Sequence, residues 1–437
     1  MATGGHELSD VDVAIVGGGF SGIAVAAELA RSATPPSVAL FERRDRIGPG
    51  VAYSTPFAGH LTNSRAAKMS AYLDDPDHFV RWLDGRGGPH DFVSRRLYGD
   101  YLVSVAAALA RPGFAAIRAT VAEIAAGPDG TFRVVAGDGA AYRARAVVLA
   151  TGNLESETAG IPPALLAHPR YVRNPYVAEY AGIDGDVLIV GSGSSALDAI
   201  VALDAAGFAG TIHTLSRRGL FPLPHAEVAG YDGVPAFDGP HTALGLVRRV
   251  RRAVADARAA GYDWRAVVDA LRGRVPALWS GLDPRERARF VRHVQRYWNV
   301  HRHRAPESIE AVRARLAAEG RLVVHRGRIA AVGDETDALA VEIGGHSPVR
   351  LVVARAINAH GPTADYTRCT DPLIAGMLAA GLLAPAPLAL GLMERCPGLF
   401  LAGPAERWER YESTAVPELR EGARLVAARV AAKLASS

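Results

Sequence analysis

The sequence of 437 residues has little cysteine and little lysine. Its two cysteines, Cys369 and Cys396, form no CxxC pair, so they exclude a disulfide framework and a cysteine-based zinc cluster. A chain so poor in thiols fits a reduced compartment, and its N-terminus lacks the charged and then apolar layout of a signal peptide. We therefore expect a cytoplasmic protein.

Positive charge is not concentrated in this chain. Lys68 and Lys433 are the only lysines, so nearly all of the 49 basic residues are arginines, and 45 acidic residues balance them to a formal net charge of +4. A nucleic-acid-binding protein gathers its basic residues in a patch or stripe. The even spread excludes nucleic acid as the main partner. His301 and His303 are two residues apart, so a helix turns them away from each other and no metal site is expected.

Long apolar runs are absent, with one exception. Residues 372–393 carry no charge over 22 positions, a length that would span a bilayer. Three prolines and three glycines interrupt this run, and each proline removes a helix donor. We expect a buried helix over 373–383 followed by an extended segment, and no membrane partner.

The sequence does contain one pattern that occurs twice. A β-like run ends in glycines, an alanine-rich helical run follows, and a second β-like run comes next, which is typical of a βαβ unit with parallel strands. The first copy comprises residues 11–17, 21–31 and 37–42, and the second comprises 186–191, 194–206 and 210–216. Each copy leads into short strands, at 117–148 and at 322–357, and the second set has predicted turns near 333–334 and 344–345.

Between residues 231 and 319 the pattern changes to helices rich in arginine. Within this segment, residues 289–304 place apolar and aromatic side chains at helical spacing, which predicts one amphipathic helix. We interpret 231–319 as an insertion into the second unit. It is expected to cover the cleft of that unit or to form an oligomer contact.

The first glycine loop, GGGFSG at residues 17–22, fits the G-x-G-x-x-G pattern between a strand and a helix. The first glycine permits a tight turn, the second lets the backbone approach a pyrophosphate, and the third lets helix and strand pack closely. The helix N-terminus supplies amide donors and a positive dipole. Glu42 ends the next strand, where a carboxylate accepts ribose hydroxyls. This context predicts a dinucleotide site.

The second loop, GSGSSA at residues 191–196, has the G-x-G-x-x-A form. Ser216, rather than an acid, ends the strand that follows, and Arg217 and Arg218 come next. A carboxylate would repel a 2′-phosphate, whereas arginines grip one through paired hydrogen bonds. The second site is therefore predicted to prefer NADPH over NADH. The alternative is that both arginines only solvate a surface loop.

The order of these motifs resembles the flavoproteins with two dinucleotide-binding domains, in which the N-terminal unit holds FAD and the inserted unit holds NAD(P)H. The motifs are GGGFSG, FE at 41–42, ATG at 150–152, GSGSSA, SRRG at 216–219 and LFLAGP at 399–404. Segments at 50–55, 60–83, 96–102, 216–222, 298–304 and 412–418 resemble a bacterial family of FAD/NAD(P)-binding proteins. That family includes an FAD-dependent urate hydroxylase and is related to class B flavin monooxygenases and amine N-hydroxylases.

The resemblance implies an α/β fold with two Rossmann-like dinucleotide-binding domains plus a helical insertion. Residues 1–180 and 361–437 would form the two parts of the FAD-binding domain, and 181–360 the NADPH-binding domain with the insertion at 231–319. Two departures affect what can be carried over. Ser64 and Arg65 replace apolar or proline residues, so a urate-type substrate is not implied. Gly403-Pro404 replaces the Gly-Asp of many flavoproteins, so the usual carboxylate contact to the ribityl chain is missing.

The same resemblance places Asn63, Lys68 and Met69 beside the isoalloxazine. Asn63 would donate to a flavin carbonyl or serve only in a turn, Lys68 would hold a substrate carboxylate or be a solvated surface charge, and Met69 is expected to pack. A last helix that starts at 413–417 would aim its N-terminus at the flavin pyrimidine, with simple capping as the alternative. Asn63 and Lys68 are the catalytic candidates. The predicted cofactor-binding residues are Gly17, Gly19, Phe20, Ser21, Gly22, Glu42, Arg43, Asn63, Met69, Thr151, Gly152, Gly403, Pro404, Thr414, Ala415, Val416, Gly191, Gly193, Ser194, Ser195, Arg217 and Arg218.

We therefore expect an NADPH- and FAD-dependent monooxygenase, with O2 and a small polar molecule as partners and with the oligomeric state left open. It would hydroxylate a nucleophilic nitrogen or an electron-rich carbon through a C4a-hydroperoxyflavin. Two alternatives stay open. One is an FAD-dependent NADPH reductase or dehydrogenase that passes electrons to a partner, although the absence of a CxxC dithiol counts against a disulfide reductase. The other is a non-catalytic redox-sensing protein that binds both nucleotides.

Overall fold

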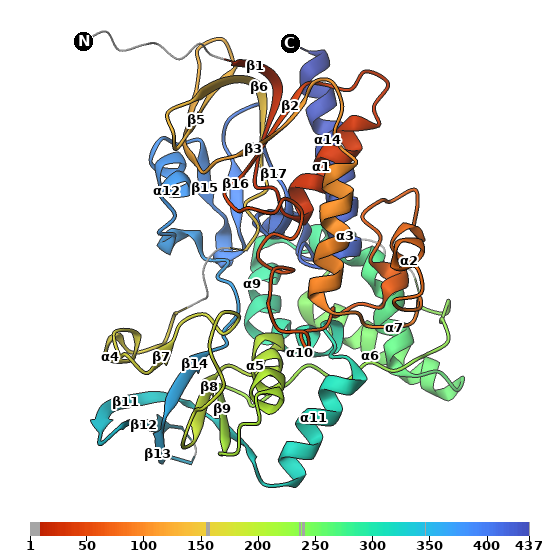
Figure 1. Ribbon diagram of the computed structural model, residues 1–437. Coiled ribbons are helices and arrows are strands. Elements are labelled where there is room, and N and C mark those ends of the chain that lie inside the picture. Colours follow the sequence, from red (N-terminus) through yellow and green to blue (C-terminus); the bar gives the residue numbers. More distant parts are fainter. Residues whose placement is uncertain (1–8, 154–157, 236, 238–240, 346, 437) are drawn as a thin grey trace, which may run out of the picture.

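The computed structural model describes residues 9–153, 158–235, 237, 241–345 and 347–436. Two α/β units lie one above the other in Figure 1, and a group of helices lies beside them. The chain begins and ends in the upper unit, so the lower unit is inserted into it. The predicted α/β fold with Rossmann-like units is confirmed.

The upper, first unit is built on a parallel sheet with the strand order β3-β2-β1-β6, and β17 lies beside β6. Its strands are β1 (Ser9–Val16), β2 (Val38–Glu42), β3 (Phe114–Arg118), β6 (Ala141–Leu149) and β17 (Leu399–Leu401). β4 (Val121–Ala126) and β5 (Phe132–Ala136) extend the first part of β6 as an antiparallel meander.

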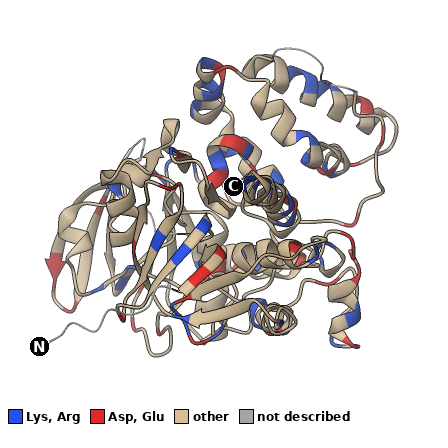
Figure 2. Cartoon of the chain, turned by 90° about the horizontal axis from the view of Figure 1, so that it is seen from above, with Lys and Arg blue, Asp and Glu red and all other residues tan. Residues whose placement is uncertain are grey.

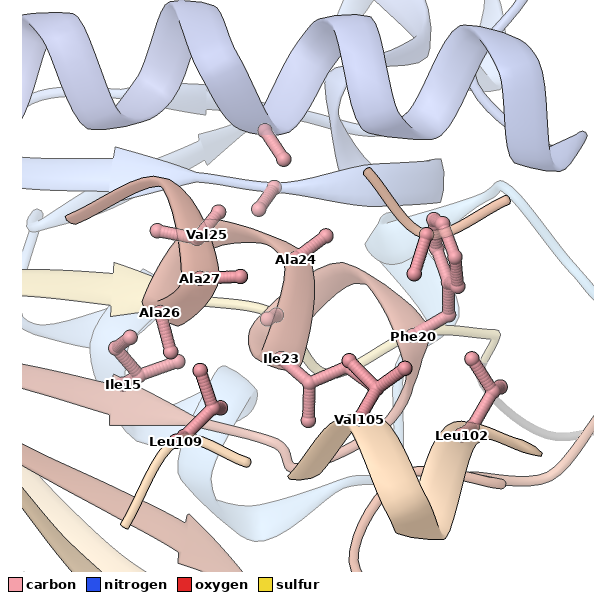
Figure 3. Close-up of a cluster of buried hydrophobic side chains, with 14 of the residues drawn as sticks. Ile15, Phe20, Ile23, Ala24, Val25, Ala26, Ala27, Leu102, Val105 and Leu109 are labelled. Atoms are coloured by element: carbon pink, nitrogen blue, oxygen red, sulfur yellow. The ribbon is translucent and has the colours of Figure 1, made fainter. Parts of the chain in front are cut away.

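Residues along β1 alternate between two hydrophobic cores because both faces of the sheet are covered. The covering elements are α1 (Phe20–Ala30), α3 (Arg95–Ala107) and α14 (Val416–Ala435) on one face, and α12 (Pro372–Ala379), β15 (Leu383–Pro385) and β16 (Leu392–Glu394) on the other. Val13 and Ile15 face α1, which Figure 3 shows between α14 and α3. Ala14 and Val16 face α12. The charge-free run thus forms a buried helix and a hairpin, and among the described residues no helix is long and apolar enough to cross a membrane.

The second unit has the parallel order β10-β9-β8-β14-β7. Its strands are β7 (Tyr171–Val172), β8 (Val187–Val190), β9 (Ile212–Ser216), β10 (Leu322–Arg326) and β14 (Arg355–Asn358). Helices α5 (Ser194–Ala205) and α11 (Glu307–Ala318) pack on one face. An antiparallel layer of β11 (Arg328–Glu335), β12 (Ala338–Gly344) and β13 (Val349–Val353) covers the other face.

The helices beside the two units are α6 (Ala243–Ala259), α7 (Trp264–Leu271), α8 (Val275–Ser280), α9 (Pro284–His293) and α10 (Gln295–Arg302). Short helices elsewhere are α2 (His78–Leu83), α4 (Pro163–Leu166) and α13 (Arg407–Arg410). Figure 2 shows basic and acidic segments interspersed along these elements, in line with the even spread of charge in the sequence.

Three local predictions were wrong. The expected turn at 333–334 lies inside β11, because pairing with β12 continues to the end of the strand and the chain turns at Asp337, which has φ +54°. Residues 289–304 form two helices, α9 and α10, rather than one, and Val294 (φ −108°) lies in a turn between them. The last helix of 231–319, α11, packs against α5 in the doubly wound unit and is no part of the helical group beside it.

Candidate nucleotide-binding sites

The first glycine loop joins β1 to α1 at the carboxyl edge of the first sheet. Gly17 adopts φ +108°, and a Cβ there would lie 2.3 Å from the carbonyl oxygen of Ala150. A Cβ on Gly22 would lie 1.9 Å from the carbonyl oxygen of Gly17, so strand and helix approach too closely for any side chain. No side chain caps α1 at Gly19. The first amides of α1 are therefore available to an anion such as a pyrophosphate.

Glu42 lies buried at the end of β2, directly beside this loop. Its carboxylate accepts hydrogen bonds from the amides of Gly18 (2.8 Å) and Arg44 (2.9 Å). The two amides fix the position of the carboxylate, whose remaining acceptor capacity fits ribose hydroxyls. Arg43, the next predicted residue, is exposed at the same edge.

Two other segments reach the same loop. The amide nitrogen of Thr151 lies 3.2 Å from the Cβ position of the first loop glycine, and Gly152 follows it with φ +69°. Gly403, with φ +86°, approaches Ser21 so closely that a Cβ would lie 2.6 Å from the Ser21 Oγ. Pro404 comes next, in the short 3-10 helix Gly403–Glu406. The structure thus gathers both segments around the N-terminus of α1.

Sequence reasoning missed a carboxyl in this turn. Glu406 Oε2 accepts a hydrogen bond from the amide of Gly403 (3.0 Å) and lies 3.4 Å from the Cβ position of Gly422 on α14. Burial raises the pKa of Glu406 to about 7. The turn that lacks the Gly-Asp carboxylate therefore carries a buried carboxyl three residues later.

The predicted flavin-side residues lie after β2, on residues 61–69, which we call the flavin-side segment. Asn63 is exposed, and its carbonyl oxygen lies 3.2 Å from His225 Nε2. Lys68 is exposed at the end of a 3-10 turn. Met69 is 1% exposed and packs in the hydrophobic core on the α1 face of the first sheet. Its backbone carbonyl accepts a hydrogen bond from the Tyr98 hydroxyl at 2.8 Å. Packing is thus the structural role of Met69, as its chemistry suggested.

The N-terminus of α14 lies beside the same segment, because Arg420 Nη1 donates to the carbonyl of Ser70 at 3.1 Å. The predicted residues Thr414, Ala415 and Val416 form its entry, and no side chain caps it, which rules out capping by Ser413 or Thr414. Glu418 in the first turn pairs with Arg302 (2.6 Å) and Arg272 (3.0 Å), and the exposed fraction of its side chain is 10%. The start of α14 is therefore held by ion pairs rather than by a cap.

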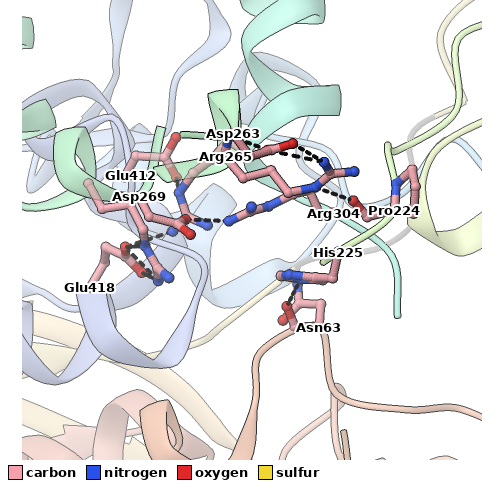
Figure 4. A network of polar contacts seen from close by, with 11 residues as sticks. Asn63, Pro224, His225, Asp263, Arg265, Asp269, Arg304, Glu412 and Glu418 are labelled. Carbon is pink, nitrogen blue, oxygen red and sulfur yellow. Dashed lines mark hydrogen bonds and ion pairs between the residues drawn. The ribbon is translucent and has the colours of Figure 1, made fainter. Parts of the chain in front are cut away.

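His225 is a second residue that sequence reasoning missed. Burial and the charge of Arg304 lower the pKa of His225 to about 3, so the ring stays neutral against Asn63. Figure 4 shows this cluster, in which Arg304 pairs with Asp269 of α7. Elements from both units and from the adjoining helices meet here. No motif in the sequence signals this meeting, because the residues are far apart along the chain.

The second glycine loop repeats the geometry of the first. Gly191 adopts φ +132°, and a Cβ there would lie 2.3 Å from the carbonyl oxygen of Ala359. A Cβ on Gly193 would meet no atom within 4 Å, and no side chain caps α5. Ser194 and Ser195 form the first turn of α5. The space beside Gly193 and the first amides of α5, which no side chain caps, therefore lie together, as a pyrophosphate site requires.

Arg217 and Arg218 are exposed directly after β9. Ser216 Oγ accepts from the amide of Gly219 at 2.9 Å and holds the turn that carries them. Arg326 ends the neighbouring strand β10, in register with Ser216, and its Nε lies 3.2 Å from the Cβ position of Gly219. The structure therefore adds a third arginine to the predicted pair. The sequence signal that could have identified Arg326 was its position at the end of the strand next to β9.

A cavity of about 500 Å³ lies between the flavin-side segment and the start of α11. Its lining includes Arg65, Arg86, His90, Phe92 and Glu307. None of the three predicted flavin-side residues lines it. Across the described ranges no group of three or more His, Cys, Asp or Glu side chains is arranged to hold a metal ion.

Residues 14–154 match a family model described as FAD-NAD(P)-binding. No curated protein matches the sequence. This match confirms the predicted cofactor class, FAD and NAD(P), and it confirms the resemblance at the level of FAD/NAD(P)-binding proteins.

Solved structures with two different activities resemble the whole chain. An ornithine hydroxylase from Pseudomonas aeruginosa has a TM-score of 0.66 at 18% identity, covering 97% of this chain and 100% of that one. An ornithine N-hydroxylase from Kutzneria sp. 744, solved with FAD, NADP⁺ and ornithine, has a TM-score of 0.59 at 18% identity, covering 97% and 99%. A bacillithiol disulfide reductase from Staphylococcus aureus has a TM-score of 0.58 at 15% identity, covering 98% and 99%. At such identities the likeness shows the fold, which both activities share.

Proposed function

We propose that this protein is an NADPH- and FAD-dependent monooxygenase that hydroxylates a nucleophilic nitrogen or an electron-rich carbon of a small polar substrate. The observation that carries the proposal is the pair of glycine loops. Each loop ends at an uncapped helix N-terminus, one beside Glu42 and the other beside Arg217 and Arg218. Two such loops with opposite charge beside them suit two different dinucleotides.

The residues of the first loop fit FAD. The amides of α1 would bind its pyrophosphate, Glu42 would accept its ribose hydroxyls, and the close approach of Gly403 leaves room for backbone contact only. Bound FAD would supply hydride acceptance and the activation of O2. The uncapped N-terminus of α14 would stabilise negative charge that develops near it.

The second loop fits NADPH. The open space at Gly193 would admit its pyrophosphate, and Arg217, Arg218 and Arg326 would bind its 2′-phosphate. Asn63 and Lys68 would bind substrate or flavin from the exposed face of their segment. The chain's own task is then to place the two nucleotides against each other and to exclude water.

A reductase is the second candidate, since disulfide reductases share the fold. Cys369 and Cys396, the only two cysteines, pack against the core on the α12 face of the first sheet. α1 and α14 cover the opposite face of that sheet. This placement favours oxygen or a separate partner, rather than a thiol pair of this chain, as the acceptor of electrons.

The test uses purified protein loaded with FAD, NADPH as the electron donor, and a panel of amines, amino acids and purines in air. We expect one panel member to stimulate NADPH oxidation and to be recovered with one added oxygen atom. Labelled O2 identifies the source of that atom.

Two other outcomes would contradict the proposal. NADPH oxidation that responds only to dyes, quinones or a protein acceptor would favour the reductase. Yellow protein that anaerobic NADPH never bleaches would favour the non-catalytic nucleotide-binding protein.

A further inference from the structure

A segment of the first unit, residues 55–61, is built into the second unit. Phe57 and Leu61 pack against the second unit's hydrophobic core on the α5 side. The Phe57 and Tyr180 ring centroids lie 5.6 Å apart. Gly59 approaches α5 so closely that its Cβ would lie 3.1 Å from Val201 Cγ1. Moving the units apart here would return these apolar side chains to water.

A buried ion pair crosses the same seam. Asp198, on the second turn of α5, is 2% exposed, and its carboxylate lies 2.9 Å from Arg95 Nη2 of the first unit. Arg95 Nε also donates to the carbonyl of Leu61 at 3.0 Å. The backbone carbonyl of Asp198 lies 3.2 Å from His60 Nε2. The buried carboxylate of Asp198 in the second unit is thus paired with Arg95 of the first unit, and the buried His60 ring of the first unit is hydrogen-bonded to a carbonyl of the second.

This contact continues to the second glycine loop. The Tyr176 hydroxyl lies 3.0 Å from Ser195 Oγ and 3.1 Å from Asp198 Oδ2. Ser195 stands in the first turn of α5, where a pyrophosphate would bind. Arg95 holds Leu61, two residues before Asn63. An unbroken chain of polar contacts therefore joins the second loop to the flavin-side segment.

We propose that residues 55–61, Arg95 and Asp198 form a fixed joint that makes the two nucleotide-binding units one rigid body. Arg95 and Asp198 are then positioning residues that set the second glycine loop at one distance from the flavin-side segment. The inference rests on the proposed function only for its effect on hydride transfer. Displacement of reacting groups by about 1 Å slows a reaction by about 100-fold, so a joint that fixes the distance between the two nucleotides would keep hydride transfer fast.

A cross-link across the joint tests its rigidity. Gly59→Cys with Val201→Cys places the two sulfurs close to disulfide geometry, because a Cβ at 59 already lies 3.1 Å from the γ-carbon at 201. Cys369→Ser and Cys396→Ser remove the native thiols from the background. We expect anaerobic bleaching by NADPH to proceed at the same rate before and after oxidation. A rate lost on oxidation and regained with a reductant would show that the units must move here, and would overturn the proposal.

Asp198→Asn and Arg95→Lys test the positioning role. Asp204→Asn is the matched control, since Asp204 lies on the same helix in an ion pair with Arg315 at the surface. In the two joint variants we expect hydride transfer to fall by about 10- to 100-fold, while the dissociation constant of NADP⁺ stays unchanged. Arg95→Lys should retain more of the rate than Arg95→Met. Equal effects of Asp198→Asn and Asp204→Asn would refute the role.

Amide hydrogen exchange measures the local stability of the joint and does not depend on enzyme activity. The amides of His60 and Thr62, which donate to the carbonyls of Phe57 and Val93, should exchange equally with and without NADP⁺, and Asp198→Asn should speed their exchange while Asp204→Asn should not. If NADPH bleaches neither the wild type nor any variant, the proposed function fails, and the exchange data still decide the joint. A change in the exchange of these two amides on NADP⁺ binding, or no change in the Asp198→Asn variant, would count against the joint whatever the activity.

Discussion

Replacing Arg217 and Arg218 by alanine should strongly reduce the preference for NADPH while leaving NADH usage intact. Both side chains are exposed at the carboxyl end of β9, and neither takes part in an ion pair within the described residues. Their charge is therefore not consumed inside the fold. A 2′-phosphate bound beside them would gain hydrogen bonds from planar guanidinium groups.

The expected size follows from the exposure of the pair. Hydrogen bonds to charged groups contribute about 1.5–3 kcal/mol each. Exposure and a screening length of about 10 Å at 0.1 M salt reduce the sum for two arginines to about 2–3 kcal/mol. Since every 1.4 kcal/mol is about tenfold, kcat/KM for NADPH should fall by about 30- to 150-fold. Arg326 would retain part of the affinity, and its removal should lower it further.

The assay compares kcat/KM for NADPH and NADH in the same preparations at two salt concentrations. Arg251→Ala with Arg252→Ala is the matched control, because it removes two exposed arginines from α6. The effect on NADPH should shrink at high salt. An unchanged ratio of the two kcat/KM values in the Arg217/Arg218 variant would refute the assignment of the 2′-phosphate site.

Four further substitutions test other parts of the site. Gly193→Ala should keep the Tm and weaken NADP⁺ binding, because its Cβ meets no protein atom within 4 Å. Gly17→Ala should lose both FAD and stability, because its Cβ would lie 2.3 Å from a carbonyl oxygen. Equal losses of Tm in the two variants would contradict this. Burial raises the pKa of Glu406 from 4.5 to about 7, so the folded state holds a proton that the unfolded chain releases. The contribution of Glu406 to the free energy of unfolding is then greatest below pH 4.5 and falls by about 3 kcal/mol as the pH rises to 7, and Glu406→Gln should remove that part of the pH dependence in urea titrations. Glu418→Gln leaves two largely buried arginines without their shared carboxylate, so the free energy of unfolding should drop by about 3–5 kcal/mol, and a drop under 1 kcal/mol would show that the charges are solvated.

The glycine loops were predictable because their signal is local. Gly17 and Gly22 are needed where a strand, a turn and a helix follow one another within a few residues, so spacing alone reports the close approach that the structure shows. Glu42 was predictable for the same reason, since the following strand must return beside the first. The Arg217 and Arg218 assignment remains a prediction that rests on the same local logic.

Contacts between distant segments were not predictable in this way. Arg95 and Asp198 are 103 residues apart, and either alone reads as an ordinary charge on a helix. The available signal was weak: Asp198 is a charge flanked by buried apolar residues of α5. Arg326 and Glu406 were missed because their partners belong to a neighbouring strand and to a turn whose motif predicts a different acid.

The helices between α6 and α10 show how far chain order and spatial order diverge. They interrupt the second unit in sequence, between β9 and α11, yet they support the returning part of the first unit. Trp279 Nε1 donates to the carbonyl of Trp408 at 2.7 Å, and Trp298 Nε1 donates to Glu412 at 2.6 Å. Arg302 reaches Glu418 in the first turn of α14. The helix N-terminus that would face the flavin pyrimidine is therefore held by residues of the insertion, so changes in the insertion should reach the flavin side before they reach the second glycine loop.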